Sequence, residues 1–297
     1  MTTNGPEVLL TGASSQIGVF AIPRLLNAGF RVLAVSRKAR PEYYSGLEQL
    51  SWLTQGDAKG SCGNCNFMFS AGPMELALDF MDLCTQLQAV VVFSSSSVIS
   101  KQFSADPSEH SQIQQMRTQE SALRSNAQAR GLKLQILRPT LIYGCGLDAN
   151  ISRLANWIRR YGFAPVNGRA RGLRQPVHAD DLASLAINAL QSDKPLPVTM
   201  SLAGGSTLSY TDMVTELFSV DEKPVRLLRL PQWLFVLIVR ILRFTAAGAG
   251  LNPEMVIRQN VDLVFDDSQA RELLDYRPRK FKPKIIDFSI PGDSINP

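Results

Sequence analysis

The sequence is short of the residues that build metal centres and disulfide scaffolds. Its 297 residues include two histidines, His110 and His178, and four cysteines. So few histidines nearly exclude a multi-histidine metal site, and a small secreted disulfide scaffold would need a denser cysteine framework. The one Cys-x-x-Cys pair, Cys62 and Cys65, lacks the second pair of ligands that zinc requires. We therefore assign no metal ligands.

Tyrosine is scarce and unevenly placed. The chain has six tyrosines, and none lies between Tyr44 and Tyr143. The segment without tyrosine includes the helix that is predicted over Glu109–Arg130. This distribution becomes important once the family resemblance is considered below.

Long apolar runs are also missing. The most apolar stretch, Trp233–Val239 with its extension to Phe244, is interrupted by Arg240 and Arg243. It is shorter than the roughly 20 residues that a membrane span requires. The N-terminus has no basic segment followed by an apolar one, so no signal peptide is predicted. We expect a cytoplasmic protein in a reducing compartment.

The composition is that of a globular protein. Hydrophobic residues make up 45% and charged residues 19% of the chain, which is enough for a substantial core. The net charge of +5 is too small to indicate nucleic-acid binding by itself. Most of the cations are arginines, whose planar guanidinium suits phosphate and carboxylate groups.

The first half of the chain alternates short apolar runs with longer helical patterns, which predicts an α/β fold. It is expected to form a Rossmann-type, doubly wound parallel sheet. The predicted strands are Val8–Thr11, Arg31–Ser36, Leu50–Thr54, Phe67–Ser70, Val90–Ser94 and Leu134–Arg138, and the helices are Ile17–Ala28, Met74–Gln88 and Glu109–Arg130.

After Tyr143 helical patterns dominate, which predicts a small, mainly helical substrate lobe. We place the cofactor domain at residues 1–145 and the lobe at 146–297, with the chain crossing back around 177–203. The predicted helices are Ile151–Tyr161, Asp180–Gln191, Tyr210–Phe218, Trp233–Phe244 and Ser268–Leu274.

The sharpest motif lies at the first strand–helix junction. A glycine there lets the backbone approach a pyrophosphate, and a second lets the helix pack closely on the sheet. The usual middle glycine is replaced by Ser15. The predicted cofactor-binding residues of this turn are Gly12, Ser14, Ser15, Gln16, Ile17 and Gly18.

The end of the second strand favours NADP over NAD. NAD sites usually carry an acidic residue there, whereas this chain has Arg37 and Lys38 and no acid from Arg31 to Pro41. The bland alternative is an exposed basic loop. Asp57, after the third strand, is a candidate for contact with the adenine amino group.

Together these features resemble the extended short-chain dehydrogenase/reductases, in an atypical form, and specifically the NAD-dependent epimerase/dehydratase family. The resemblance covers nearly the whole chain. It rests on the ordered motifs TGASSQIG at 11–18, Gly56-Asp57, Ser70-Ala71-Gly72, the serine run Ser94–Ser97, LRPTLIYG at 137–144, RQPVHADDLA at 174–183 and DDSQAR at 266–271.

The resemblance implies a lobe that binds a nucleotide sugar and further cofactor contacts at Ser70, Ala71, Gly72, Ser94 and Pro139. It also implies that one serine hydroxyl, best matched by Ser95, hydrogen-bonds the substrate oxygen at the carbon that gains or loses a hydride. The alternative is that the small serine side chains only allow the strand end to pack beneath the nicotinamide.

The family's acid/base pair, a tyrosine and a lysine four residues later, has no counterpart here. Arg117 best matches the lysine, which places Ile113 at the tyrosine position. Arginine is a poor proton shuttle because its pKa is too high. The substitute groups considered are Lys101, which we rank first, Glu109, His110 and Glu120. The plain interpretation of Lys101 and Glu109 is that they are solvated loop and helix-cap charges, and that of His110 is a surface role.

The predicted substrate segment, residues 149–179, contains six arginines and no acidic residue. Arg174 matches a family position that commonly contacts phosphate. Tyr143, Asn150 and His178 complete the predicted substrate site, with a structural role as the stronger alternative for His178.

Residues 231–244 are predicted as a buried helix of the lobe or, alternatively, as a patch that touches a membrane or a partner. The basic segment Arg277–Lys284 is expected to be a solvated tail. Homodimerisation is left open. Two functions remain: an NAD(P)-dependent reductase or epimerase of a nucleotide-linked sugar, or a non-catalytic NADP-binding sensor or assembly factor.

Overall fold

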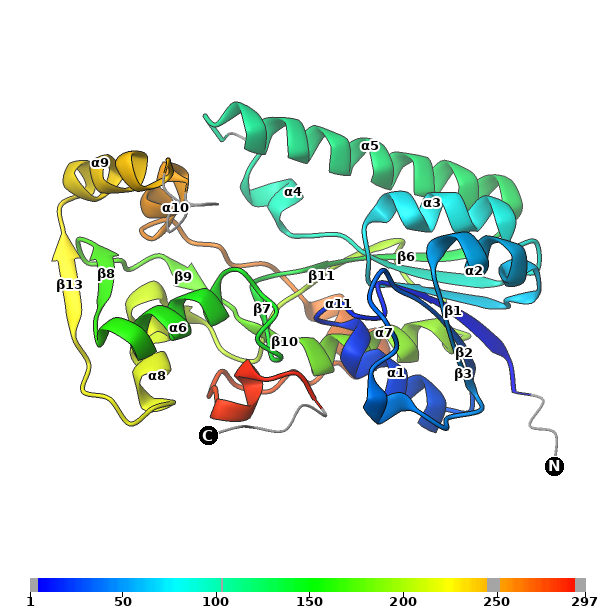
Figure 1. The fold of residues 1–297 in the computed structure, drawn as a ribbon. Coiled ribbons are helices and arrows are strands. Elements are labelled where there is room, and N and C mark those ends of the chain that lie inside the picture. The colour runs from blue at the N-terminus through cyan, green and yellow to red at the C-terminus, as the bar shows by residue number, and fades with distance from the viewer. Residues whose placement is uncertain (1–4, 103, 245–251, 292–297) are drawn as a thin grey trace.

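A single seven-stranded parallel sheet forms the centre of the protein (Figure 1). The computed structural model describes residues 5–102, 104–244 and 252–291. The strand order is β11-β6-β5-β4-β1-β2-β3, so the direction of winding reverses between β1 and β4. The strands are β1 (Glu7–Thr11), β2 (Arg31–Val35), β3 (Leu50–Leu53), β4 (Phe67–Ser70), β5 (Ala89–Phe93), β6 (Lys133–Pro139) and β11 (Thr199–Leu202).

Helices cover both faces of this sheet, which confirms the doubly wound prediction (Figure 1). One face carries α1 (Gly18–Asn27), α7 (Ala179–Leu190) and α11 (Ser268–Leu274), and the other α3 (Met74–Leu83) and α5 (Pro107–Arg130). Every residue of β5 is buried, as expected for a strand packed on both sides. Separate apolar clusters fill the two faces.

The helix α5 is bounded by clear local signals. The Asp106 carboxylate accepts hydrogen bonds from the backbone N–H groups of Ser108 and Glu109, and Pro107 occupies the first turn. Gly131 ends the helix in the left-handed conformation, with a φ of 64°. About three turns beyond Glu109, Glu120 of this helix bonds Arg138 of β6 and Ser94 directly after β5.

The second lobe is built from short elements around its own core (Figure 1). Its helices are α6 (Ile151–Tyr161), α8 (Tyr210–Ser219), α9 (Gln232–Leu242) and α10 (Pro253–Arg258). Three small strand pairs complete it: β7 (Ile142–Tyr143) with β10 (Val177–His178), β9 (Leu173–Arg174) with β12 (Leu208–Ser209), and β8 (Ala164–Asn167) with β13 (Leu227–Leu230).

Short helices connect the larger elements, and most were not predicted. Thr54 accepts a hydrogen bond from the Asp57 N–H at the start of α2 (Gln55–Ser61). This helix was not predicted because it contains two glycines, which disfavour helix. The serine run continues into α4 (Ser97–Ser100). Single turns of 3₁₀-helix are η1 (Glu42–Tyr44), η2 (Cys62–Asn64) and η4 (Ile285–Phe288).

The basic C-terminal segment is anchored to the protein, although its five cations are exposed. Arg279 pairs with Asp180 and Asp181 at the start of α7, and Phe281 is buried against Tyr143. The expectation of a solvated tail holds for the five cations and fails for Phe281, which anchors the segment.

The expectation of a buried helix at Trp233–Phe244 was also wrong. Only Phe235 and Val239 of α9 are buried, while the opposite face is open to solvent. Within the parts of the chain that the structure describes, no helix has the length and apolar character needed to cross a membrane.

Candidate functional site

The turn between β1 and α1 lies where the sheet reverses its winding, the usual place for a dinucleotide in such folds. Gly12 has a φ of 71°, and a Cβ there would come within 2.5–2.7 Å of the backbone of Ala71 and Gly72. A Cβ on Gly18 would lie 2.2 Å from the carbonyl oxygen of Gly12. Two strand ends and one helix start therefore meet with no room for side chains. This is the cradle that a pyrophosphate requires.

The residues between these glycines shape the turn. The Gly18 N–H donates to Ser15 Oγ at 3.1 Å, so Ser15 stabilises the first turn of α1 where the usual motif has glycine. The amide Nε2 of Gln16 is buried and has no hydrogen-bond partner. A buried donor of this kind is costly unless a ligand oxygen satisfies it. The turn therefore fits an anionic group.

The end of β2 forms the far side of this cradle. Ser14 Oγ lies 2.8 Å from Ser36 Oγ, and Ser36 Oγ also accepts from the Lys38 N–H at 3.0 Å. The Trp52 indole donates to the Lys38 carbonyl at 2.9 Å and holds the loop in place. Ser36 was not among the predicted site residues, although its position directly before Arg37 could have indicated it.

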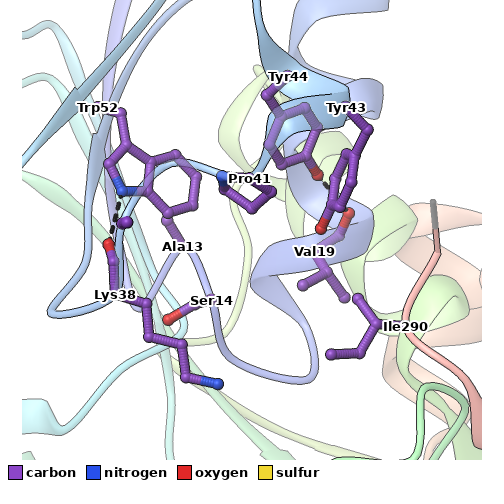
Figure 2. A pocket seen from close by; sticks show the side chains of 10 residues that line it. Ala13, Ser14, Val19, Lys38, Pro41, Tyr43, Tyr44, Trp52 and Ile290 are labelled. Carbon is purple, nitrogen blue, oxygen red and sulfur yellow. Dashed lines mark hydrogen bonds between the residues drawn. The ribbon is translucent and has the colours of Figure 1, made fainter. Parts of the chain in front are cut away.

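A cavity of about 70 Å³ adjoins this loop (Figure 2). Ala13, Ser14 and Lys38 contribute to one side of it, and Tyr43 and Tyr44 to the other. Ile290, from the C-terminal segment, also lines it, so that segment lies beside the candidate cofactor edge. Arg37 is exposed next to Lys38. Asp57 lies in the first turn of α2, where its carboxylate accepts from the Thr54 hydroxyl at 2.7 Å, and it remains exposed.

The other predicted cofactor contacts lie at neighbouring strand ends. Ser70 Oγ is buried 2.8 Å from Thr11 Oγ1, so its side chain points into the sheet. Ala71 and Gly72 form the wall opposite Gly12. Pro139, at the end of β6, accepts at its carbonyl from the Ser96 N–H at 3.0 Å. These positions present mainly backbone to the candidate cofactor edge.

Ser95 follows β5 and is half-buried. Its Oγ accepts a hydrogen bond from the Ser97 N–H at 3.1 Å. The hydroxyl proton is not used in that bond. Ser95 is therefore oriented so that it can donate to an oxygen atom above the strand end.

Glu120 is fully committed to a buried ion pair. Arg138 of β6 donates through both Nε, at 2.8 Å, and Nη2, and Ser94 donates from its hydroxyl at 2.7 Å. Burial alone would raise the pKa of Glu120, but the hydrogen bonds from Arg138 and Ser94 outweigh it and lower that pKa. An ionised, fully paired carboxylate is a poor proton donor, so the geometry argues against the acid role predicted for Glu120.

Lys101 belongs to a second ion-pair cluster. Its Nζ donates to Glu109 at 2.9 Å, and Arg258 of α10 donates to both oxygens of the same carboxylate at 2.8 Å. Ser104 adds a further hydrogen bond. Burial favours the neutral acid, yet the hydrogen bonds from Arg258, Ser104 and Lys101 hold the pKa of Glu109 at about 2. Arg258 was missed by sequence reasoning because it lies 149 residues from Glu109.

Apolar side chains stand where the family's proton donor would be. The helix α5 contains neither tyrosine nor lysine. Going back from Glu120 along the same face, Met116 is half-buried and Ile113 is buried. Arg117 donates to the Val98 carbonyl and to Gln102 Oε1, tying α5 to the end of α4. His110 is exposed on the helix surface.

Arg174 is oriented toward the protein backbone. Its guanidinium donates to the carbonyls of Leu173 and Val261 at 2.7 and 2.8 Å and to that of Arg258. It stacks 5.5 Å from the ring of Tyr210 and is buried. These contacts close the end of α10. The structure thus shows Arg174 in a structural arrangement, and the predicted phosphate contact would require those bonds to be exchanged.

The remaining predicted substrate residues also have internal partners. Tyr143 is 1% exposed and packs edge-on against His178 and Phe281. His178 accepts at Nδ1 from the Asp180 N–H and contacts Asp287 at 3.3 Å, which is the anchoring role given as its stronger alternative. The N–H of Asn150 donates to Asp148, and the Asn150 side chain is exposed at the start of α6.

Comparison with known proteins supports the resemblance, but the sequence matches cover only about half of this chain. No family model matches the chain. It is 24% identical over 159 residues to the UDP-glucose 4-epimerase of Vibrio cholerae, covering 54% of this chain and 46% of that protein. It is 27% identical over 155 residues to the uncharacterized protein y4nG of Sinorhizobium fredii (strain NBRC 101917 / NGR234), covering 51% and 38%. The matches span less than half the length of these relatives.

Solved structures match along nearly the whole chain. The UDP-glucuronic acid 4-epimerase of Bacillus cereus, in complex with UDP-glucuronic acid and NAD, has a TM-score of 0.68 at 16% identity, covering 92% of this chain and 94% of that one. MoeE5 in complex with UDP-glucose and NAD has a TM-score of 0.66 at 20% identity, with the same coverage. The UDP-glucose 4-epimerase of Thermotoga maritima, with UDP-glucose, has a TM-score of 0.64 at 14% identity, covering 96% and 97%.

The resemblance to the extended short-chain dehydrogenase/reductases is confirmed. One sequence relative and two of the three solved structures above are named as nucleotide-sugar 4-epimerases, and two of the three structures contain NAD. At these identities the structural matches establish the fold of this chain. Its cofactor preference, substrate and chemistry are argued below.

Proposed function

We propose that this chain is an NADP-dependent reductase or epimerase of a nucleotide-linked sugar that works without the usual tyrosine–lysine pair. The observation that carries the proposal is the crowded turn at Gly12. Its positive φ and its close contact with the backbone of Ala71 and Gly72 exclude a side chain at Gly12. This supports a turn in which the backbone N–H groups at the start of α1 can face a pyrophosphate. The nucleotide-sugar relatives described above supply the substrate class.

The preference for NADP rests on the end of β2. Two exposed cations, Arg37 and Lys38, follow the linked hydroxyls of Ser14 and Ser36. A 2′-phosphate accepts hydrogen bonds from exactly such donors, whereas an unmodified ribose is usually held by a carboxylate. No acidic residue lies between Arg31 and Pro41.

When bound, the nicotinamide would supply or accept the hydride. The chain itself would contribute the Ser95 hydroxyl, which is oriented by the Ser97 N–H and donates to the substrate oxygen. Glu109 and Glu120 are ionised and paired, so neither holds a proton to give. We therefore assign the proton exchange to water at the half-buried Ser95.

A second function is favoured by the same ion pairs. Lys101, Glu109 and Glu120 each hold structural contacts, and Ile113 stands at the position that matches the family's tyrosine. A protein that only binds NADP, as a sensor or assembly factor, needs the crowded turn and no proton donor.

The test combines cofactor titration with turnover. Calorimetry with NADPH and NADH should give tighter binding of NADPH, by about tenfold or more if the two cations each contribute a charge-assisted contact. The double variant Arg37→Ala/Lys38→Ala should remove the difference, while Lys59→Ala, a change to an exposed lysine elsewhere, should not. Equal or tighter binding of NADH to the wild-type chain contradicts the NADP assignment.

Turnover is measured as the absorbance of the nicotinamide band with a panel of UDP- and dTDP-linked 4-keto sugars. The enzyme proposal predicts a change that Ser95→Ala reduces about 100-fold and Ser100→Ala leaves intact. Tight NADPH binding without turnover or sugar-nucleotide binding selects the non-catalytic function instead.

A further inference from the structure

The helix α9 presents an apolar stripe that no described part of the chain covers. Trp233, Leu237, Ile241 and Phe244 are 69%, 47%, 62% and 80% exposed. At about 100° per residue Trp233, Leu237 and Ile241 fall within roughly 80° of the helix circumference, and Phe244 lies in the turn directly after the helix. Together these four residues form what we call the α9 stripe.

The opposite face of the same helix explains why α9 is fixed in place. Phe235 and Val239 are buried against Val256 of α10, with Leu230 and Val236 packed around them. The helix is therefore held by its inner face, and the α9 stripe is not needed for that packing. The α9 stripe is therefore exposed although the helix itself is packed on the lobe. The helix α9 lies at the outer end of the lobe, far from the edge strand β3 (Figure 1).

Cations flank the stripe, and acids are missing from the surrounding sequence. Arg240 is exposed and lies one turn from Leu237 and one turn from Phe244. The guanidinium of Arg243 stacks 4.8 Å from the ring of Phe244. From Lys223 to Pro253 the chain contains five cations and no aspartate or glutamate.

We propose that the α9 stripe docks on an anionic membrane surface. Exposed tryptophan and phenylalanine beside arginines suit the interface between lipid headgroups and acyl chains. A neutral apolar partner would not need the arginines, and a cationic partner would be repelled by them. The complementary surface is therefore both apolar and negatively charged, as a bilayer with anionic lipids is. The helix lies in the plane of that surface and does not cross it.

The proposal is independent of the reaction. It requires only the fold of the lobe and the exposure of α9, so membrane binding and turnover can succeed or fail separately. Its consequence is that the candidate site would work close to a bilayer.

Vesicle co-sedimentation of the full chain tests the proposal. We expect binding to phosphatidylcholine vesicles that contain phosphatidylglycerol, little binding to pure phosphatidylcholine, and loss of binding at high salt. Leu237→Glu/Ile241→Glu should lower the partition coefficient at least about tenfold. The matched control Leu47→Glu/Leu83→Glu adds the same charges at two exposed leucines elsewhere and should bind as the wild type does.

A second variant keeps the test valid if the glutamates disturb folding. Arg240→Gln leaves every apolar contact of α9 in place and should lower binding to the anionic vesicles about fivefold, the effect of one cation near such a surface. Absence of wild-type binding to anionic vesicles overturns the proposal. So does a stable dimer in light scattering that Leu237→Glu/Ile241→Glu dissociates, because the stripe would then be covered by a second copy.

Discussion

The cofactor edge and the α5 face of this protein make an instructive contrast. The edge at Gly12 and Gly18 consists of backbone in close contact, and the proposed dinucleotide site rests on that contact. The α5 face consists of side chains, and here they are engaged with one another: Glu120 with Arg138, and Glu109 with Arg258. The cofactor edge is formed by backbone atoms, so few substitutions can alter it without disturbing the fold. On the α5 face, the side chains form structural ion pairs.

This contrast separates binding from chemistry. A backbone cradle at the end of β1 is also part of the sheet and the start of α1, so altering it disturbs the fold. A side chain on the surface of a helix, such as a tyrosine, can differ without disturbing the fold in this way. The ion pairs of α5 also serve the architecture, because Glu109 joins the Rossmann domain to α10 of the lobe.

The largest expected effect comes from breaking the pair at Glu120. Glu120→Ala would leave the mostly buried Arg138 without its partner and should reduce the free energy of unfolding by about 3–5 kcal/mol. Denaturant titration measures this change. Asp193→Ala is the control: its pair with Lys133 is exposed, so the loss should be below about 0.5 kcal/mol. A loss below about 1 kcal/mol for Glu120→Ala would show that the α5 face is not structural.

The next effect tests the cofactor edge. Gly12→Ala combines a left-handed backbone with collision against Ala71 and Gly72, and should lower stability by about 2–4 kcal/mol as well as NADPH affinity at least about tenfold. Gly29→Ala is the matched control, since its φ is 84° but nothing lies within 4 Å of the added Cβ. It should lose only about 1 kcal/mol and bind cofactor normally. Equal behaviour of the two variants in thermal unfolding and calorimetry would remove the steric argument for the cradle.

The smallest effect is a pH dependence. The pKa of Glu109 is about 2 in the folded protein against an ordinary value of 4.5. A lowered folded-state pKa means that the carboxylate contributes stability above pH 4.5 and that this contribution is lost as the pH falls toward 2. The loss should be on the order of 2 kcal/mol, allowing for solvent screening. Glu109→Gln should flatten this part of the stability profile measured by urea unfolding; an unchanged slope would assign it to other carboxylates.

The fold was largely predictable because its signals are local. Continuous apolar runs marked the first six strands of the main sheet, and the structure moves their ends by only one residue or so. Asp106, Pro107 and Gly131 bound α5 for reasons visible in the sequence. The predicted helix at Met74–Gln88 ran too long, because Cys84 turns to an extended conformation while the surrounding residues stay apolar.

The candidate site was predictable only in part. The turn at 11–18 is contiguous, so the glycines and Ser15 could be located directly. Arg174 looked like a phosphate ligand because guanidinium groups bind phosphate, yet its partners are carbonyls 84 and 87 residues away. Tyr143 follows a family motif but is buried by Phe281, which lies in a segment that appeared merely basic.

The sequence by itself determined the parallel sheet, the crowded turn at its switch point, and the lack of any tyrosine or lysine on α5. These follow from local periodicity, from glycine's conformational freedom and from residue identity. Only the tertiary structure decided which charges are available. Lys101, Glu109 and Glu120 were candidates for the proton, with Lys101 ranked first, and Arg174 was a candidate for a phosphate contact. The fold pairs Glu109 with Arg258 and Glu120 with Arg138, and it turns Arg174 toward backbone carbonyls.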